Sequence, residues 1–319
     1  MTELQTARDR RGATKQNAGT QANPEKIEVP VDFFRKELAA DQDAVFIPPQ
    51  VERRSVFQCV GGRHVHYVGG KVVCEWEGSA AERYKDVSGS VFIEGRHIVM
   101  KYTGDAFSGG GTFRKEKTFR FFPNVYIQNC RVENVHGSYD ALHADIFQMD
   151  YALRGLNIDR LTGDTNYQAL YLRPMAPVSS IDLRRCNFRR NAGPGDKETF
   201  LIYFFRHHED VERSSHMIYL TDIYCEIPEG LDPMQCFSPR KGLAQGADAE
   251  GPYVWWPDLT QRIQDLNGRP GRIRLGRPPG GDFVTAANAG LNYRSPGYQH
   301  GRATSGRPTT ETSYSFSCE

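Results

Sequence analysis

One short pattern recurs between Val65 and Gly230, and it constrains the fold of this chain more than any other feature. Each copy has four apolar positions and a closing glycine. Two residues, one residue and two residues separate the successive apolar positions, and one further residue precedes the glycine. The clearest copies end at Gly137, Gly163 and Gly193, and less regular copies end at Gly78, Gly104 and Gly230. A repeat of 26 to 37 residues predicts a solenoid, in which each unit buries its apolar side against the next unit.

The residues inside each repeat indicate strands. Each period carries a second strand-like segment after its glycine, at residues 143–148, 168–173, 199–205 and, less clearly, 234–237. Short segments rich in Val, Ile, Tyr and Phe, separated by Gly and Asn turns, are typical of a β-solenoid. Aligning the copies predicts one interior row of Ile127, Leu153 and Leu183, a second row of Cys130, Leu156 and Cys186, and equivalent turns at Gly137, Gly163 and Gly193.

The repeat, the run NVYIQNCRVENVHG and the segment DALHADIFQ together resemble the pectate-lyase-like parallel β-helix superfamily. The resemblance covers about residues 55 to 240. It implies an all-β fold, a right-handed parallel β-helix. The superfamily includes polysaccharide lyases, some glycoside hydrolases and phage tailspikes. Because one architecture hosts many activities, the resemblance does not choose the reaction.

The segments outside the repeat predict a cap and two irregular arms. Residues 1–26 are polar and form an arm that is flexible or ordered by a partner. Residues 27–54 are expected to cap the stack with a short helix between Val29 and Ala40, because Val31, Phe34 and Leu38 stand at helical spacing.

The β-helix is expected over residues 55–240, and the extension 241–319 is rich in Gly, Pro and Arg and irregular. In that extension the run RIRLG is expected to add a last strand. The rest can wrap the stack, mediate subunit contacts or stay mobile.

Charge and composition narrow the partners. Forty Lys plus Arg balance thirty-nine Asp plus Glu, so no global field attracts nucleic acid or an anionic membrane. No apolar run is long enough to span a membrane, and residues 1–26 lack the apolar core of a signal peptide. We therefore expect synthesis in the cytoplasm, with assembly into a virion-like particle as an open alternative. Seven scattered cysteines without a CxxC pair predict reduced thiols and no zinc site.

Alternation along the strands predicts one polar flank. In DALHADIFQ, His143 and Asp145 project to the same side, and the next segment offers Tyr171 and Arg173. Strands of successive turns lie about 4.8 Å apart, so equivalent side chains form a row that suits a long ligand. Arg binds carboxylates, Tyr stacks on sugar faces, and His or Asp moves protons. The predicted catalytic residues are His143, Asp145 and Arg173, and the predicted ligand-binding residues are Asp140, Tyr171, Tyr203, Arg206 and His207.

A plainer interpretation competes with this flank. Asp140, His143 and Asp145 can simply satisfy backbone groups at a turn that enters a strand, and an Arg173 in solvent is ordinary at a strand end. His207 and His208 favour a loop role over a metal role, since no ligand set accompanies them. No metal or cofactor is expected, and calcium stays open although the flank offers few carboxylates. The loops around Trp255 and Trp256 are the alternative location for a ligand site.

These observations favour a carbohydrate-recognising protein that binds an extended polysaccharide along its flank, as a phage-like spike or receptor-binding component does. A homo-oligomer or phage-like assembly is left open. One alternative is a polysaccharide lyase or glycoside hydrolase. A hydrolase needs two carboxyl groups, and the alternation along the strands places only that of Asp145 on the flank. A second alternative is a purely structural solenoid.

Overall fold

A computed structural model describes residues 24–111, 121–150, 153–172, 180–191, 199–205 and 216–295 of this chain. This part of the chain is all-β. Its strands form two sheets, and its only helical segments are short 3-10 turns: η1 (Pro233–Gln235), η2 (Pro257–Leu259) and η3 (Gly290–Asn292). Within these ranges no helix combines the length and the apolar character that crossing a membrane requires.

The larger sheet, sheet A, is parallel along most of its length. Its path runs β1-β3-β5-β8-β11-β13-β15-β17 and then continues through β22, β20 and β19. The bounds are β1 (Glu25–Glu28), β3 (Ala44–Ile47), β5 (His64–Val68), β6 (Lys71–Cys74), β8 (Ser90–Glu94), β9 (His97–Met100), β11 (Asn124–Val135), β13 (Gly155–Thr165), β15 (Ser180–Arg190), β17 (Met217–Glu226), β19 (Ala244–Asp248), β20 (Gly251–Trp255), β21 (Ile263–Gln264) and β22 (Ile273–Leu275).

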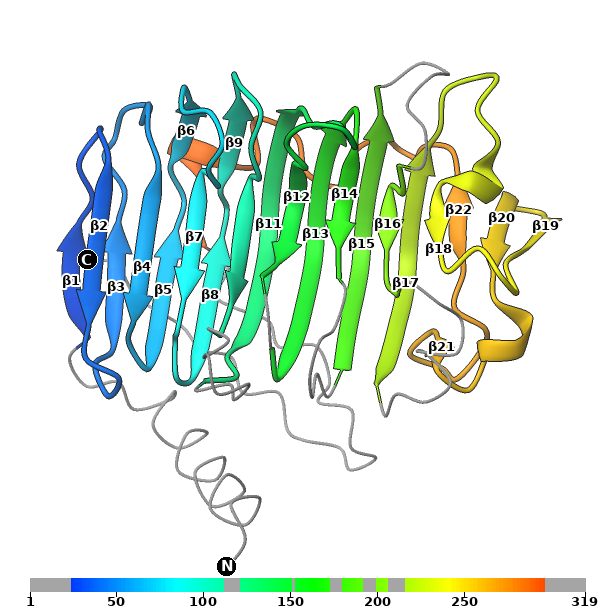
Figure 1. Cartoon of the computed structure of the whole chain (residues 1–319), viewed down its shortest axis with the longest axis horizontal. Helices are drawn as coiled ribbons and strands as arrows, with labels where there is room; N and C mark the ends of the chain where they lie inside the picture. Colours follow the sequence, from blue (N-terminus) through cyan, green and yellow to red (C-terminus); the bar gives the residue numbers. More distant parts are fainter. Residues whose placement is uncertain are drawn as a thin grey trace, which may run out of the picture.

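The smaller sheet, sheet B, has eight strands in the order β2-β4-β7-β10-β12-β14-β16-β18, all paired in parallel. The bounds are β2 (Phe34–Leu38), β4 (Phe57–Gly61), β7 (Glu82–Lys85), β10 (Phe107–Gly110), β12 (Asp145–Met149), β14 (Gln168–Tyr171), β16 (Ile202–Tyr203) and β18 (Phe237–Ser238). The chain passes alternately through sheet A and sheet B, and we call each such passage a rung. Figure 1 shows the rungs side by side in sequence order, from blue to yellow.

A bend divides the long strands of sheet A into two legs. Asn129, with a φ of 54°, stands opposite Arg160, with a φ of 60°, because the residues on both sides of them are in register. The same left-handed conformation recurs on the neighbouring rungs at Gly69, Gly95, Arg185 and Asp222. The bend explains the "apolar, two residues, apolar" pattern, since it brings residues three apart, such as Ile127 and Cys130, to the same buried side.

In one copy of the repeat, the residues that fill the interior rows lie five positions further along the chain than predicted. Ile127, Ile158, Leu183 and Leu220 form one row, and Cys130, Leu161, Cys186 and Ile223 form the other. The predicted places of Leu153 and Leu156 in these rows are therefore wrong, although both residues are buried. The sequence pattern fits both alignments, because the predicted and the observed residues of this copy are all leucine or isoleucine.

The predicted equivalence of Gly137 and Gly163 is also wrong. Gly163 lies within β13 opposite Val132, where a Cβ would come 2.6 Å from Ile146 Cδ1. This glycine therefore makes room for a core side chain and does not mark a turn. Gly193 lies outside the described residues.

The predicted capping helix between Val29 and Ala40 is wrong as well. Residues 34–38 form β2, and together with β1 and β3 they belong to the first rungs of both sheets. Phe34 and Leu38 are four residues apart, a spacing that places two side chains on the same face of a helix and also of a strand. Pairing with β4, in which Phe34 lies opposite Phe57, decides for the strand.

One ion pair lies inside the stack. Arg96 and Glu82 are both fully buried, and Arg96 Nε donates to Glu82 Oε1 over 2.6 Å. Arg96 also lies over the Tyr67 ring, 3.9 Å from its centroid. Gly70 leaves space for it, because a Cβ there would come 2.5 Å from Arg96 Nη1. The pair thus joins sheet B to the bend of sheet A across the core.

The extension after residue 240 closes the last rung. The run RIRLG forms β22, which confirms the expected last strand, and the antiparallel hairpin β19–β20 pairs with it. Trp256 is buried and donates from Nε1 to the carbonyl oxygen of Pro239 over 2.8 Å. This end of the stack is therefore covered by the chain itself.

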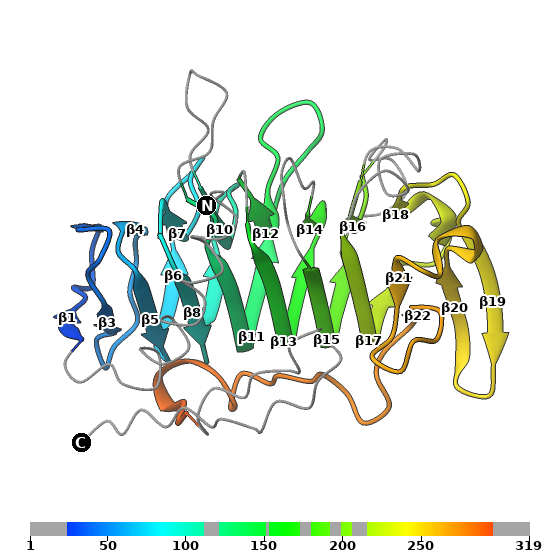
Figure 2. The same cartoon turned by 90° about the horizontal axis from the view of Figure 1, so that it is seen from below.

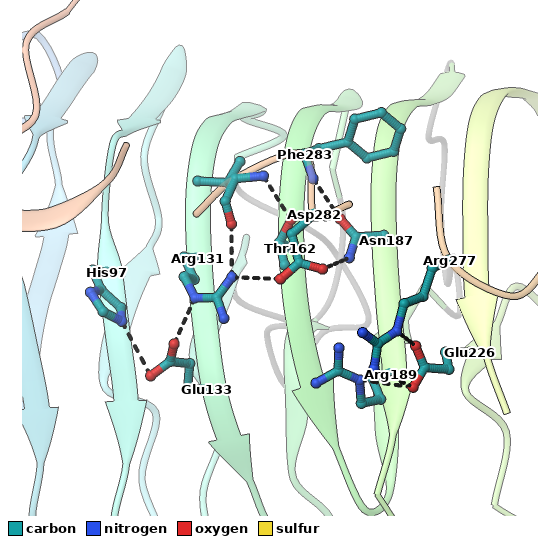
Figure 3. A network of polar contacts seen from close by, with 11 residues as sticks. His97, Arg131, Glu133, Thr162, Asn187, Arg189, Glu226, Arg277, Asp282 and Phe283 are labelled. Atoms are coloured by element: carbon teal, nitrogen blue, oxygen red, sulfur yellow. Dashed lines mark hydrogen bonds and ion pairs between the residues drawn. The ribbon is translucent and has the colours of Figure 1, made fainter. Parts of the chain in front are cut away.

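Residues 276–295 then run back along the outer side of sheet A, and we call this segment the strap (orange in Figure 2). Asp282 accepts hydrogen bonds from Arg131 Nη1 and Asn187 Nδ2, each over 2.9 Å, as Figure 3 shows. Val284 N donates to Thr162 Oγ1 over 2.9 Å, and Arg277 pairs with Glu226. Part of the extension therefore wraps the stack, which was one of the expected roles.

Candidate functional site

The outer face of sheet B presents one side chain from each strand in register. We call this set the outer row: Arg35, Gln58, Arg83, Ser108, Gln148, Tyr171, Tyr203 and Ser238. The residue before each of them, such as Phe57, Phe107 or Phe147, is buried in the core, except for the half-buried Phe34. Because alternate side chains of a strand face opposite sides, the outer row points away from the core.

Two aromatic rings lie next to each other in the C-terminal half of this row. The rings of Tyr171 and Tyr203 stack with centroids 5.1 Å apart and planes 19° apart. Phe200 packs against Tyr203 at 5.3 Å, and the guanidinium of Arg240 lies 4.8 Å from the Phe200 ring centroid. Tyr171 is half-buried, whereas Tyr203 keeps 9% of its surface. The result is a continuous aromatic platform of three rings on two neighbouring rungs.

Polar groups form the central part of the row. Arg83 Nε donates to Ser108 Oγ over 3.1 Å, and Gln148 Nε2 donates to Asp150 Oδ1 over 3.0 Å. The first bond joins neighbouring rungs, and the second joins residues two positions apart on the same rung. These side chains are therefore held in place before any ligand arrives.

Two carboxyl groups lie together where β10 and β12 begin. Asp105 stands opposite Asp145 by extension of the β10–β12 register, and Asp105 Oδ1 accepts a hydrogen bond from the backbone N–H of Asp145 over 3.0 Å. Asp105 is 7% exposed and Asp145 is 1% exposed. Next to them on β14 lies Gln168, in register with Asp145. Among the described residues, Asp145 Oδ1 and Gln168 Oε1 have no hydrogen-bond partner.

Burial favours the protonated form of both acids. It raises the pKa of Asp105 to about 7, with a further contribution from the charge of Asp150, while the backbone N–H of Asp145 opposes the rise. Burial and the charges of Asp105 and Asp150 hold the pKa of Asp145 well above its ordinary range. At neutral pH this pair therefore carries protons that ordinary aspartates would have lost.

His143 and Asp145 do not share a face, contrary to the alternation predicted for DALHADIFQ. β12 begins only at Asp145, so His143 belongs to the loop of residues 137–144 that rises above β12 in Figure 2. His143 is exposed, and its ring packs 6.0 Å from Tyr139 and 5.3 Å from Tyr167. Its Nε2 lies 3.3 Å from the carbonyl oxygen of Tyr139. The expected exposure of Asp145 is wrong, because the core and its neighbours enclose it.

The other predicted residues divide into three groups. Tyr171 and Tyr203 lie side by side in the outer row, as expected from their equivalent positions. Asp140 is exposed on the loop that carries His143. Arg173, Arg206 and His207 lie outside the described residues.

Sequence reasoning missed Asp105. A signal was available, because Asp105-Ala106-Phe107 and Asp145-Ile146-Phe147 are the same short motif on successive rungs. The irregular copy of the repeat around Gly104 concealed the alignment. Trp256, proposed as part of a second search area, has a structural role beneath the last rung.

In the ranges that the structure covers, no group of three or more His, Cys, Asp or Glu side chains is arranged to hold a metal ion. The cysteines there are buried and unpaired. Comparison with protein families, with curated proteins and with solved structures finds no match to this chain. Its function therefore has to be argued from the site.

Proposed function

We propose that this chain is a right-handed parallel β-helix that binds an extended polysaccharide along the outer row of sheet B. The alternating passage through two parallel sheets supports the architecture. Connections between parallel strands are nearly always right-handed, which supports the hand. A receptor-binding component of a phage-like particle would use the same row for attachment, without turnover.

The stacked pair Tyr171 and Tyr203 carries this proposal. Aromatic rings combine a large apolar face with a polar edge, which suits the apolar faces and hydroxyl groups of sugars. Here the rings repeat at the spacing of neighbouring strands, and the half-buried side chain of Gln148 continues the same row next to the buried Ser108. A repeating arrangement along the stack fits a repeating polymer better than a compact small molecule. Nucleic acid is disfavoured by the near balance of positive and negative charges, which leaves no net positive field.

The test compares Tyr171→Ala, Tyr171→Phe and Tyr219→Ala in affinity electrophoresis against a panel of soluble polysaccharides. Tyr219 is a half-buried tyrosine on sheet A and serves as the matched control. Tyr171→Ala should weaken binding roughly tenfold, which corresponds to about 1.4 kcal/mol, while the other two variants bind as the wild type does. Equal binding by all four proteins would reject the outer row as the binding site.

A second candidate function, glycoside hydrolysis, is favoured by the pair Asp105 and Asp145. Glycosidic cleavage requires one carboxyl group that is protonated at the working pH and a second, ionised carboxyl group that acts as base or nucleophile. Asp145, whose pKa burial holds well above its ordinary range, suits the first role. Asp105, whose pKa of about 7 leaves it partly ionised near neutral pH, suits the second. Asp105→Asn and Asp145→Asn should then stop the release of reducing ends while binding persists. A lyase would release unsaturated ends instead, and a purely structural solenoid would neither bind nor cleave.

A further inference from the structure

Exposed aromatic and apolar side chains form a second line on this molecule, separate from the outer row. We call it the aromatic strip and define it as Phe33, Trp76, Tyr102, Tyr139 and Leu142. Their exposed fractions are 49%, 54%, 52%, 55% and 44%. Large apolar side chains are rarely left in solvent as a contiguous set unless they bind something.

The strip follows the corner where the chain leaves sheet A and enters sheet B. Phe33 precedes β2, Trp76 lies between β6 and β7, Tyr102 lies between β9 and β10, and Tyr139 and Leu142 lie between β11 and β12. Sheet B places these strands in the order β2, β4, β7, β10 and β12. At about 4.8 Å for each strand, the strip spans about 19 Å along the stack.

Contacts between the rungs that carry these side chains make the strip continuous, and one of them reaches across the intervening rung of β4. The rings of Phe33 and Trp76 lie 6.4 Å apart. The segments that carry Trp76 and Tyr102 are joined by backbone bonds from Lys101 N to Cys74 O over 3.0 Å and from Gly78 N to Thr103 O over 2.8 Å. Leu142 reaches back to the same place, since a Cβ on Gly78 would lie 3.7 Å from its Cδ1.

The strip ends beside the acid pair. Tyr139 packs against His143, which packs against Tyr167, and Tyr167 directly precedes Gln168. Gln168 is in register with Asp145. A chain-like ligand that follows the strip is thereby directed toward the start of β10 and β12, where Asp105 keeps 7% of its surface exposed and Asp145 keeps 1%.

The chemistry beside the strip favours an uncharged occupant. Glu75, Glu77 and Asp140 are exposed next to it, and they outnumber the exposed cations Arg54 and Lys101. Carboxylates at this spacing repel the carboxylates of a uronic-acid polymer, but they accept hydrogen bonds from sugar hydroxyls. A second copy of this chain is a poor fit, because a stable protein interface needs roughly 20–30 residues on each side and the strip is one side chain wide.

We propose that the aromatic strip is a set of subsites for a neutral glycan, with sugar units stacked on successive rungs and the chain continuing to the acid pair. This inference rests on the proposed function and adds its substrate class and the path of the polymer. The strip contributes affinity only for chains long enough to extend from Tyr171 and Tyr203 past the acid pair.

The experiment measures binding of β-1,3-glucan, mannan and dextran, as neutral glycans, and of polygalacturonate and alginate, as acidic ones, in long-chain and short-oligosaccharide form. The proteins are the wild type, Trp76→Ala, Tyr102→Ala, Trp76→Phe and Tyr171→Ala. Leu266→Ala is the control, because Leu266 is 37% exposed and lies away from the strip. Trp76→Ala and Tyr102→Ala should each weaken binding of a long neutral glycan roughly fivefold and leave short oligosaccharides unaffected. Trp76→Phe and Leu266→Ala should bind as the wild type does.

Binding that depends on Tyr171 and not on Trp76 or Tyr102 would overturn the strip and leave the proposed function standing. Binding of the acidic polymers alone would overturn the neutral class and again leave the outer row intact. Loss of self-association in Trp76→Ala, with unchanged glycan affinity, would reassign the strip to an interface between copies of this chain. A wild-type protein that binds no glycan would overturn both proposals.

Discussion

Asp105 and Asp145 are separated by forty residues and yet share one hydrogen bond, because the register of β10 and β12 places equivalent residues together. Their burial is the property that matters chemically. An aspartate on an exposed flank would be ionised at neutral pH, whereas burial favours the protonated form of these two. The same burial imposes a dependence of stability on pH.

That dependence can be measured with Asp105→Asn, which keeps the oxygen that accepts from Asp145 N and cannot titrate. The folded state holds the Asp105 proton up to a pKa of about 7, whereas the unfolded chain releases it near its ordinary value of 3.8. Between these pH values the folded state binds more protons, so the free energy of unfolding of the wild type falls as pH rises from about 4 to about 7. The contribution is at most about 4 kcal/mol, because one pKa unit corresponds to about 1.4 kcal/mol.

Chemical denaturation at pH 4.5, 5.5 and 7 checks this expectation. The difference in unfolding free energy between the wild type and Asp105→Asn should shift in favour of the variant as pH rises. If that difference stayed constant across the three pH values, Asp105 would have an ordinary pKa in the folded protein.

At the scale of elements, the bend in the long strands is the feature that sets the register of the core. Left-handed conformations are costly for residues other than glycine, and here Asn129, Arg160, Arg185 and Asp222 adopt them on successive rungs. The strands pair on both sides of the bend, so the neighbouring rungs hold each of these residues in place.

At Arg160, glycine should be more favourable for stability than valine, which is the reverse of the usual order within a strand. Arg160→Gly should be at least as stable as the wild type, whereas Arg160→Val should lose roughly 1–3 kcal/mol, because a β-branched side chain resists a positive φ. Asn157, which lies in the same strand before the bend, is the control: Val should be tolerated there and Gly should cost stability. Denaturant unfolding of the four variants gives the comparison, and the same ranking at both positions would contradict the argument.

The elements also show how far the sequence could predict this fold. Alternation correctly placed Tyr171 and Tyr203 in one row, and the recurrence of Cys130 and Cys186 correctly gave one interior position. The repeat pattern misplaced Leu156, because several aliphatic residues of β13 satisfy the pattern equally well. Only the pairing of β11 with β13 places Leu161 opposite Cys130. Alternation also missed the burial of Asp145, since an aspartate after His143 looks exposed until Asp105 is placed beside it.

At the scale of the whole molecule, the strap is held by the outer side chains of several rungs. Its end is fixed by Tyr293, whose hydroxyl donates to Glu94 Oε1 over 2.6 Å and accepts from Asn129 Nδ2 over 2.9 Å. Gly290 is bonded through its backbone to Gly70 and Gly95. The Tyr293 ring lies where a side chain on Gly95 would have to be.

Gly95→Ala should therefore release the end of the strap. The added Cβ would overlap the Tyr293 ring at a position where φ is already 64°. Gly230→Ala is a matched control, because its φ is 84° and nothing lies within 4 Å of the added carbon. Limited proteolysis followed by mass spectrometry should show faster cleavage within residues 276–295 in Gly95→Ala than in Gly230→Ala. Equal rates would mean that backbone strain alone, and not the contact with Tyr293, governs the effect.

A stack of repeats in which each unit touches only its neighbours can fray from either end, and its melting then spreads over a range of conditions. The bond between Tyr293 and Glu94 joins residues 199 positions apart and makes the strap depend on rungs that come early in the chain. An early rung cannot open without undoing that closure, and the closure cannot form until the early rungs exist. The chain should therefore unfold as a single all-or-none unit, with docking of its C-terminal segment as a late event in folding.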